Sequence, residues 1–171
     1  MFSIFKIFKK KKIVPHIRLT GVIGSVGKFK QGLDFNGQQE IIQKAFAIKK
    51  AKAIAISINS PGGSPVQSHL IYSYIRKQAK KNKKKVLIFA EDVAASGGYL
   101  IACAGDEIYA NSSSIIGSIG VIYSSFGLQE LIKKAGIQRR IYTAGKNKST
   151  LDPFVEEKKE DIERLKKIQL E

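Results

Sequence analysis

The stretch Ala53-Ile-Ala-Ile-Ser-Ile-Asn-Ser-Pro-Gly-Gly-Ser-Pro65 indicates the fold of this chain. Residues 53–59 are short, apolar and rich in β-branched Ile, which is typical of a strand buried on both faces of a parallel sheet. The Pro and Gly residues that follow predict a turn, and residues 66–80 are then expected to form a helix. A strand, a turn and a helix in this order are the first part of a βαβ unit.

The same alternation continues on both sides of this stretch. Further strands are predicted at residues 17–26, 86–90, 107–110 and 139–142, and helices at residues 39–49, 129–135 and from 162 onward. Residues 93–104 are expected to turn sharply into a helix of small residues. Strands that alternate with helices favour a mostly parallel sheet with flanking helices, so the predicted fold class is α/β.

Length and composition fit one globular domain. The chain has 171 residues, of which 43% are hydrophobic, and a chain of this size can bury roughly 70% of its unfolded surface without disulfides or metal. Its single cysteine, Cys103, is interpreted as a small core residue, and the absence of a partner cysteine favours a reducing compartment. We expect residues 15–171 to form one domain, truncated at the C-terminus because its last helix has no cap.

The charge is strongly positive, with 30 Lys and Arg against 14 Asp and Glu and a net charge of +16. Basic residues cluster around residues 6–12, 80–85 and 133–140. Such runs occur in proteins that bind nucleic acid or anionic lipid, and also on ordinary solvated surfaces. Because no aromatic residues are interleaved with the central run, no platform for stacking nucleic-acid bases is expected, and nucleic acid is not predicted as a partner.

The N-terminal tail, residues 1–14, combines aromatic and basic residues. Its apolar part is too short and too charged for a membrane-spanning helix, and its lysines follow the apolar part rather than precede it as in a signal peptide. Phe2, Ile4, Phe5 and Phe8 beside the lysines favour a segment lying on an anionic membrane surface. A tail without a binding role remains the alternative, and the expected location is cytoplasmic or peripheral at the inner membrane.

Two glycine-rich clusters follow predicted strands. Ser60-Pro-Gly-Gly63 can bring backbone N–H groups close to a ligand, although a plain turn into a helix has the same composition. Ala94-Ala-Ser-Gly-Gly-Tyr99 is similar to the tight turn that presents a nucleophilic serine between a strand and a helix. Ser96 is therefore a candidate nucleophile, with helix capping as its alternative role.

A nucleophilic serine needs a base, and histidine is the first candidate. The chain offers only His16 and His69. A triad of Ser96, His69 and either Asp92 or Asp106 is possible, but no spacing in the sequence favours it.

Lysine is the second candidate for the base. A lysine acts as a base only where burial lowers its pKa from about 10.4 to near neutral, which corresponds to roughly 4 kcal/mol. The polar cluster at residues 143–154 supplies two candidates, Lys146 and Lys148.

Four motifs in one order make the chain resemble the signal peptide peptidase A, protease IV and SohB family of serine peptidases. The resemblance runs from about Arg18 to Glu171. The motifs are Asn59-Ser-Pro-Gly-Gly-Ser64, Ala95-Ser-Gly-Gly-Tyr99, Gly117-Ser-Ile-Gly-Val121 and Ala144-Gly-x-x-Lys148.

This resemblance implies a ClpP/crotonase-like fold and a catalytic Ser-Lys dyad. Ser96 would be the nucleophile and Lys148 the general base, while Ser118 would orient the lysine. Gly63 and Gly97 would supply the N–H groups of the oxyanion hole.

The resemblance also implies partners. The substrate would be an unfolded protein or an extended peptide with small or apolar side chains, such as a signal-peptide remnant, bound along Gly62 and Gly98. Neighbouring protomers of a homo-oligomeric ring would share each active site. No cofactor is implied, and no metal-ligand spacing is present in the sequence.

Two other functions remain open. A crotonase-like acyl-CoA enzyme would also use glycine-rich oxyanion loops, but it would not need both Ser96 and Lys148. A non-catalytic, membrane-associated scaffold of the same fold would keep its function after Ser96→Ala, whereas a peptidase would lose it.

Overall fold

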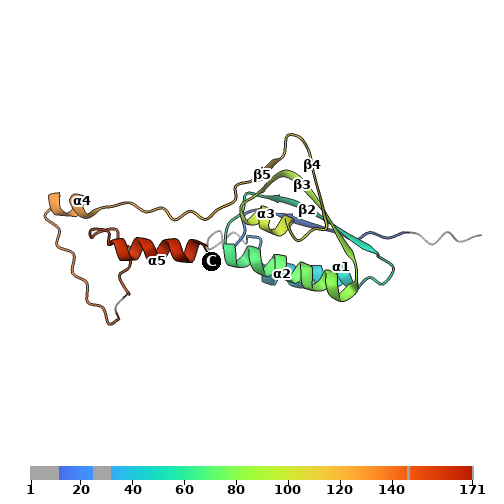
Figure 1. Cartoon of the computed structure of the whole chain (residues 1–171), viewed down its shortest axis with the longest axis horizontal. Coiled ribbons are helices and arrows are strands. Elements are labelled where there is room, and N and C mark those ends of the chain that lie inside the picture. The colour runs from blue at the N-terminus through green and yellow to red at the C-terminus, as the bar shows by residue number, and fades with distance from the viewer. Residues whose placement is uncertain (1–11, 25–31, 146, 171) are drawn as a thin grey trace, which may run out of the picture. The chain divides into compact units, whose positions relative to one another are not determined.

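The computed structural model describes residues 12–24, 32–145 and 147–170 (Figure 1). The chain divides into two compact units, Met1–Ile119 and Gly120–Glu171, called the first and second unit below. Residues 1–11 of the predicted membrane-surface tail lie outside the described residues. The prediction of one domain over residues 15–171 stays a prediction.

A parallel five-stranded sheet forms the centre of the first unit. Its strands are β1 (His16–Thr20), β2 (Ala53–Ser60), β3 (Lys85–Ala95), β4 (Glu107–Ala110) and β5 (Ile115–Gly117). The strand order is β1-β2-β3-β4, and β5 pairs with the end of β3 beyond β4. The mostly parallel sheet predicted from the alternating elements is confirmed.

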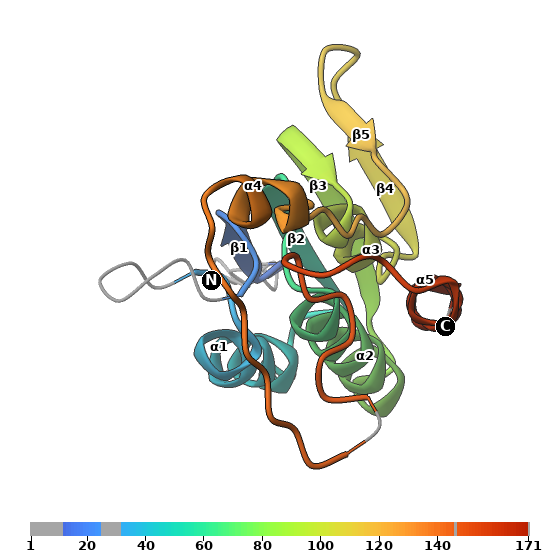
Figure 2. The ribbon, with the colours of Figure 1, turned by 90° about the vertical axis from the view of Figure 1, so that its left-hand side faces the viewer.

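Helices α1 (Phe35–Ala47) and α2 (Pro65–Asn82) lie side by side along the sheet, and the short helix α3 (Gly97–Ala102) follows β3 (Figure 2). Ile54, Ile56 and Ile58 of β2 are fully buried together with Ile71 and Ile75 of α2. This shared apolar core holds the sheet and the helices together.

Local sequence explains where α2 begins and ends. The Ser64 hydroxyl accepts a hydrogen bond from the Gln67 N–H (3.4 Å), and Pro65 occupies the first turn, where its missing N–H costs nothing. Lys83 ends the helix in the left-handed conformation.

The predicted boundaries around residues 17–26 and 93–104 need correction. β1 ends at Thr20, because Gly21 and Gly24 adopt positive φ and break the extended chain. Residues 93–95 belong to β3, so α3 begins only at Gly97. Cys103, the residue that caps the C-terminus of α3, is exposed rather than in the core.

The second unit contains α4 (Gln129–Lys134) and α5 (Lys159–Leu170), and none of its described residues is buried. The predicted strand at residues 139–142 is wrong: these residues form no strand. Within the described second unit no other strand is available to pair with them, and Arg139 instead pairs with Asp152 and lies over the Phe154 ring. None of the helices in the described ranges is long and apolar enough to cross a bilayer.

Candidate active site

Three polar or glycine-rich segments meet at the carboxyl edge of the sheet. Ser60 at the end of β2 is paired with Ala94 in β3, and Ala95 is paired with Gly117 at the end of β5. The turns after these three parallel strands are therefore neighbours, and the carboxyl edge of a parallel sheet is where ligands bind in open α/β folds.

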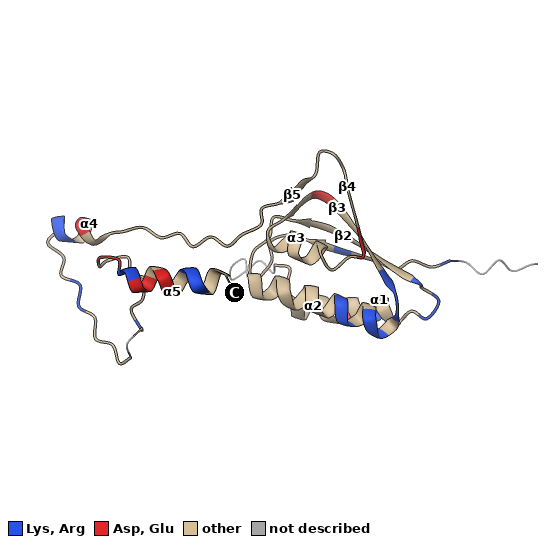
Figure 3. Cartoon of the chain, viewed as in Figure 1, with Lys and Arg blue, Asp and Glu red and all other residues tan. Residues whose placement is uncertain are grey.

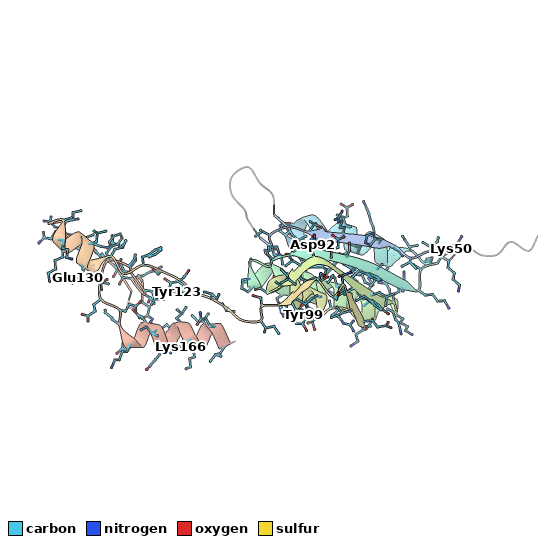
Figure 4. The ribbon with its side chains drawn as sticks, turned by 90° about the horizontal axis from the view of Figure 1, so that it is seen from above. Lys50, Asp92, Tyr99, Tyr123, Glu130 and Lys166 are labelled. Atoms are coloured by element: carbon cyan, nitrogen blue, oxygen red, sulfur yellow. The ribbon has the colours of Figure 1, made fainter. Side chains whose placement is uncertain are left out.

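Ser96 occupies the turn between β3 and α3 in a strained backbone conformation. Its φ of 51° and ψ of −121° are rare for a residue with a side chain. The Ser96 N–H donates to the Gly117 carbonyl (2.7 Å), which ties the turn to β5. The hydroxyl makes no capping hydrogen bond, so the alternative role of Ser96 as a helix cap is not what the structure shows. Asp92 of β3, before the turn, and Tyr99 of α3, after it, are labelled in Figure 4.

Gly62 packs directly against this turn. A Cβ atom at Gly62 would lie 2.8 Å from the Ser96 Cβ and 2.9 Å from the Gly97 nitrogen, and its φ is +99°. No other residue type fits there without movement of the Ser96 turn.

Gly63 is held by a parallel bridge to Ile23. The Ile23 N–H donates to the Gly62 carbonyl (2.8 Å), and the Ser64 N–H donates to the Ile23 carbonyl (2.8 Å). In such a bridge the N–H of Gly63 points away from Ile23. Among the described residues it has no acceptor, so it is available to a bound group.

Gly97 and Gly98 are buried at the start of α3. A Cβ atom at Gly97 would overlap the Ser68 hydroxyl, and one at Gly98 would lie 2.6 Å from the Ser60 carbonyl oxygen. The first hydrogen bond of the helix runs from the Leu100 N–H to the Ser96 carbonyl (3.0 Å). The N–H groups of both glycines therefore have no acceptor within the described chain.

Asn59 is a residue at this edge that the sequence analysis did not single out. Its side-chain amide donates to the Asp92 carboxylate (2.8 Å) and accepts from the Val93 N–H (3.3 Å). These bonds lie where the pairing register between β2 and β3 shifts. They join the end of β2, which leads into the glycines of residues 60–63, to the end of β3, which leads to Ser96. An Asn immediately before Ser-Pro-Gly-Gly was the only signal for it.

Neither histidine is linked to Ser96. His69 bonds to the Ser73 hydroxyl (3.1 Å), and His16 bonds to the Ser57 hydroxyl (3.0 Å). His16 also lies at the beginning of β1, near the opposite edge of the sheet. The aspartates of the histidine alternative are engaged elsewhere, Asp92 with Asn59 and Asp106 with Arg76 and the Val86 N–H. The described hydrogen bonds give the triad no support.

Ser118 and Lys148 stand in different units. Ser118 is exposed with a φ of 53° and directly follows Gly117, whose partner Ala95 directly precedes Ser96. Lys148 is an exposed residue of the second unit, and its N–H donates to the Gly145 carbonyl (3.4 Å). The structure therefore describes Ser118 and Lys148 each within its own unit. Lys146, the other candidate base, lies outside the described residues.

The amino-acid sequence of the chain is similar to those of two proteins that have different names. The chain is 60% identical over 159 residues to a protein of Brucella melitensis named Na(+)/H(+) antiporter NhaA, covering 92% of this chain and 22% of that protein. It is 36% identical over 130 residues to the chloroplastic serine protease SPPA of Arabidopsis thaliana, covering 72% of this chain and 19% of that protein. The chain thus spans about a fifth of the length of each of these relatives.

A solved structure supports the fold. A serine-to-alanine mutant of the 1510-N membrane-bound stomatin-specific protease matches with a TM-score of 0.51 at 21% identity, covering 74% of this chain and 65% of that chain. Together with the parallel sheet and flanking helices, this similarity confirms the predicted ClpP-like fold.

The sequence profile described as "Peptidase family S49" matches residues 78–169, which include Ser96, Ser118 and Lys148. This match and the SPPA relative confirm the resemblance to signal peptide peptidase A. Because the profile covers more than half of the 171 residues, the chain belongs to peptidase family S49.

Proposed function

We propose that this chain is a serine endopeptidase with a Ser-Lys dyad, in which Ser96 is the nucleophile and Lys148 the general base. The observation that carries the proposal is the strained turn at Ser96. A serine with positive φ and no capping hydrogen bond, between a parallel strand and a helix, has the geometry of a presented nucleophile.

In this mechanism, Ser96 Oγ attacks the carbonyl carbon of the scissile peptide bond. Lys148 accepts the hydroxyl proton and passes it to the leaving amine, which departs as the C–N bond breaks. Lys148 then takes a proton from water, and the resulting attack on the acyl-enzyme releases the acid and restores Ser96. Ser118, which follows the strand paired with the Ser96 strand, orients the lysine through its hydroxyl.

The developing oxyanion would be held by the N–H groups of Gly63 and Gly97. Both lack an acceptor within the described chain, and both lie beside the Ser96 turn. Removing one such donor typically slows acyl transfer by about 100-fold to 1,000-fold. Gly62 and Gly98 would complete the wall of the substrate site for an extended peptide; their missing side chains let the segment at residues 60–63 pack closely against the Ser96 turn and the start of α3.

The proposed substrates are unfolded proteins and apolar peptides, including remnants of signal peptides. Lys148 belongs to the second unit and is exposed, while a lysine base needs a site that excludes water. Lys148 would therefore need to be enclosed, and we infer that it enters the site of a neighbouring protomer in a ring, which two chains would form together.

Casein turnover by the full chain tests this proposal. Ser96→Ala should lower the turnover by at least about 1,000-fold, and Lys148→Ala by about 100-fold or more. Ser112→Ala and Lys158→Ala, which change exposed residues outside the proposed site, are the matched controls and should retain wild-type turnover.

A mixture of the two inactive variants tests the shared site. After subunit exchange, some sites would combine an intact Ser96 with an intact Lys148, and part of the activity should return. Unchanged turnover in Lys148→Ala would contradict the lysine mechanism. Full activity in Ser96→Ala would contradict the peptidase proposal as a whole and favour the scaffold alternative.

A further inference from the structure

Extra residues in β3 interrupt its pairing with β2 near the carboxyl end of the sheet. On one side of the interruption Ile58 is paired with Ala90. On the other side Ser60 is paired with Ala94. A single residue of β2 therefore lies opposite residues 91–93 of β3, which we call the bulge. Bulges are common next to active sites, where they change the direction in which the following side chains point.

The bulge determines how far Ser96 lies from Gly62 and Gly63. Without it, Ser60 would be paired with Asp92, and the Ser96 turn would lie two residues, or about 7 Å, farther along the sheet. In the structure, a Cβ atom at Gly62 would lie 2.8 Å from the Ser96 Cβ. A displacement of that size would remove this contact and take the Gly63 N–H out of reach of an oxyanion formed at Ser96.

Side chains replace the strand partners that the bulge lacks. β3 pairs with β4 before the bulge and with β5 from Val93 onward, so Glu91 and Asp92 have no strand partner among the described residues. The Ser114 hydroxyl donates to the Glu91 carbonyl (2.6 Å). The side-chain oxygen of Asn59 accepts from the Val93 N–H (3.3 Å). Backbone groups away from water need such partners, so these bonds stabilise the bulge.

Asn59 is the residue of β2 that lies opposite the bulge. Its carbonyl accepts from the Gly21 N–H (3.0 Å), which holds the backbone of Asn59 on its other side. Its side-chain amide donates to the Asp92 carboxylate (2.8 Å) and accepts from the Val93 N–H. One side chain thus joins two of the three bulge residues to the strand that leads into residues 60–63.

The two carboxylates of the bulge have different partners. Glu91 forms an ion pair with Arg18 of β1 (2.8 Å). Asp92 forms no ion pair with any residue that the structure describes, and its carboxylate accepts from the Asn59 amide. In Figure 3 these two acidic residues are the red segment of β3. Hydrogen bonds to a charged group are roughly twice as strong as neutral ones, so the bond between Asn59 and Asp92 holds the bulge firmly.

We propose that Asn59 is a positioning residue that fixes the bulge and thereby keeps Ser96 beside Gly62 and Gly63. Asn59 acts through the backbone of β3 rather than by contact with the reacting atoms. The inference rests on the proposed role of Ser96 as the nucleophile. The alternative is that Asn59 only stabilises the sheet, and a variant would then lose folded protein while the folded part kept its turnover rate.

Casein turnover by the full chain tests the inference. Asn59→Ala removes both side-chain bonds and should lower kcat per folded chain by about 100-fold, because a displacement of about 1 Å has an effect of that size. KM should change by less than about threefold. Asn82→Ala is the matched control, since the Asn82 side chain also donates two hydrogen bonds, both to Gln78 near the end of α2. It should keep the wild-type kcat.

Exchange of two side chains separates positioning from general stabilisation. Asn59→Asp alone places two carboxylates against each other and should lower kcat by about tenfold or more. When Asp92→Asn is added, the donor and the acceptor of the pair are exchanged, and the Val93 N–H keeps an oxygen acceptor. The double variant should therefore recover kcat to within about threefold of wild type.

Hydrogen exchange of the backbone amides of residues 93–97 measures the bulge independently of activity. Exchange should be about tenfold faster in Asn59→Ala than in wild type or Asn82→Ala. Unchanged exchange, a wild-type kcat in Asn59→Ala or no recovery in the double variant overturns the inference. If Ser96→Ala is inactive, each of these results leaves the proposed function intact. Full turnover by Ser96→Ala overturns the proposed function, and the positioning role with it.

Discussion

Gly62 and Ser96 show at the residue scale how the candidate site depends on backbone contact. The Gly62 backbone approaches the Ser96 turn so closely that a single added carbon would lie within 3 Å of three of its atoms. Both residues also have positive φ. The segment at residues 60–63 and the proposed nucleophile therefore pack against each other, and a substitution in one should shift the backbone of the other.

Gly62→Ala should destabilise the first unit and inactivate the proposed peptidase. Gly21→Ala is the matched control, since Gly21 has a similar φ (+108°) but no described atom within 4 Å of an added Cβ. Strain from φ should affect both variants, while overlap should add about 1–3 kcal/mol only in Gly62→Ala. Urea unfolding measures the difference, and equal stabilities would show that the close contact with Ser96 is unimportant.

Some residues of the site could be predicted from sequence and others could not. Ser96 was predictable because small residues after a strand are typical of a presented nucleophile. The role of Gly117 as acceptor for the Ser96 N–H was not, because it depends on β5, whose three residues carry no periodicity. Asn59 was missed for a similar reason, since its partners Asp92 and Val93 lie on another strand.

Asp106 shows at the element scale how α2, β3 and β4 are joined. Its carboxylate accepts from the Val86 N–H at the start of β3 (2.8 Å) and from Arg76 of α2 (2.9 Å), just before β4 begins. The hydrogen bond from the Val86 N–H, assisted by Arg76, holds the pKa of Asp106 below its ordinary value of 3.8.

This lowered pKa predicts a loss of stability in acid. Because the folded pKa is below the unfolded one, Asp106 contributes fully above its unfolded pKa, and the contribution is lost as the pH falls through the folded pKa. Asp106→Asn should therefore cost about 1 kcal/mol at neutral pH and less near pH 3, below the unfolded pKa.

Urea unfolding of wild type and Asp106→Asn at both pH values measures the effect. Glu40→Gln, which breaks the exposed pair with Lys44, serves as the control and should change stability less. If the cost of Asp106→Asn were the same at both pH values, ionisation of Asp106 would not be its cause.

Element boundaries were predictable where local chemistry sets them. Ser64, Pro65 and the αL residue Lys83 explain why α2 lies close to its predicted range. Residues 139–142 have the composition of a strand but no strand partner in the described second unit, so composition alone gave a wrong prediction there. Pairing is a property of the folded chain and not of the segment.

At the scale of the whole molecule, the two units differ in how far their apolar side chains are buried. The first unit buries many of its large aliphatic residues in one core, although others, such as Val66 and Ile119, are exposed. The second unit buries none of its described residues, although Ile122, Phe126 and Tyr142 are 91%, 83% and 92% exposed. Apolar surface of this extent is generally covered by another part of a protein or by a partner, and in the proposed shared site the second unit, with Lys148, would be covered by another protomer.

The overall architecture was predictable because alternating strands and helices admit few folds, whereas assembly was suggested only by the family resemblance. Oligomers depend on surfaces that no local pattern in one chain reveals. The proposed roles of Ser96 and Lys148 accordingly need a test that does not presuppose either the substrate or the assembly.

Labelling of the full chain with a fluorophosphonate, followed by peptide mapping, tests the central claim most directly. The reagent bonds covalently to a serine that a base has activated. The account predicts one adduct at Ser96, formed at least about 100-fold more slowly in Lys148→Ala and at the wild-type rate in Lys158→Ala. An adduct at another serine, or labelling of Ser96 at an unchanged rate in Lys148→Ala, would contradict it.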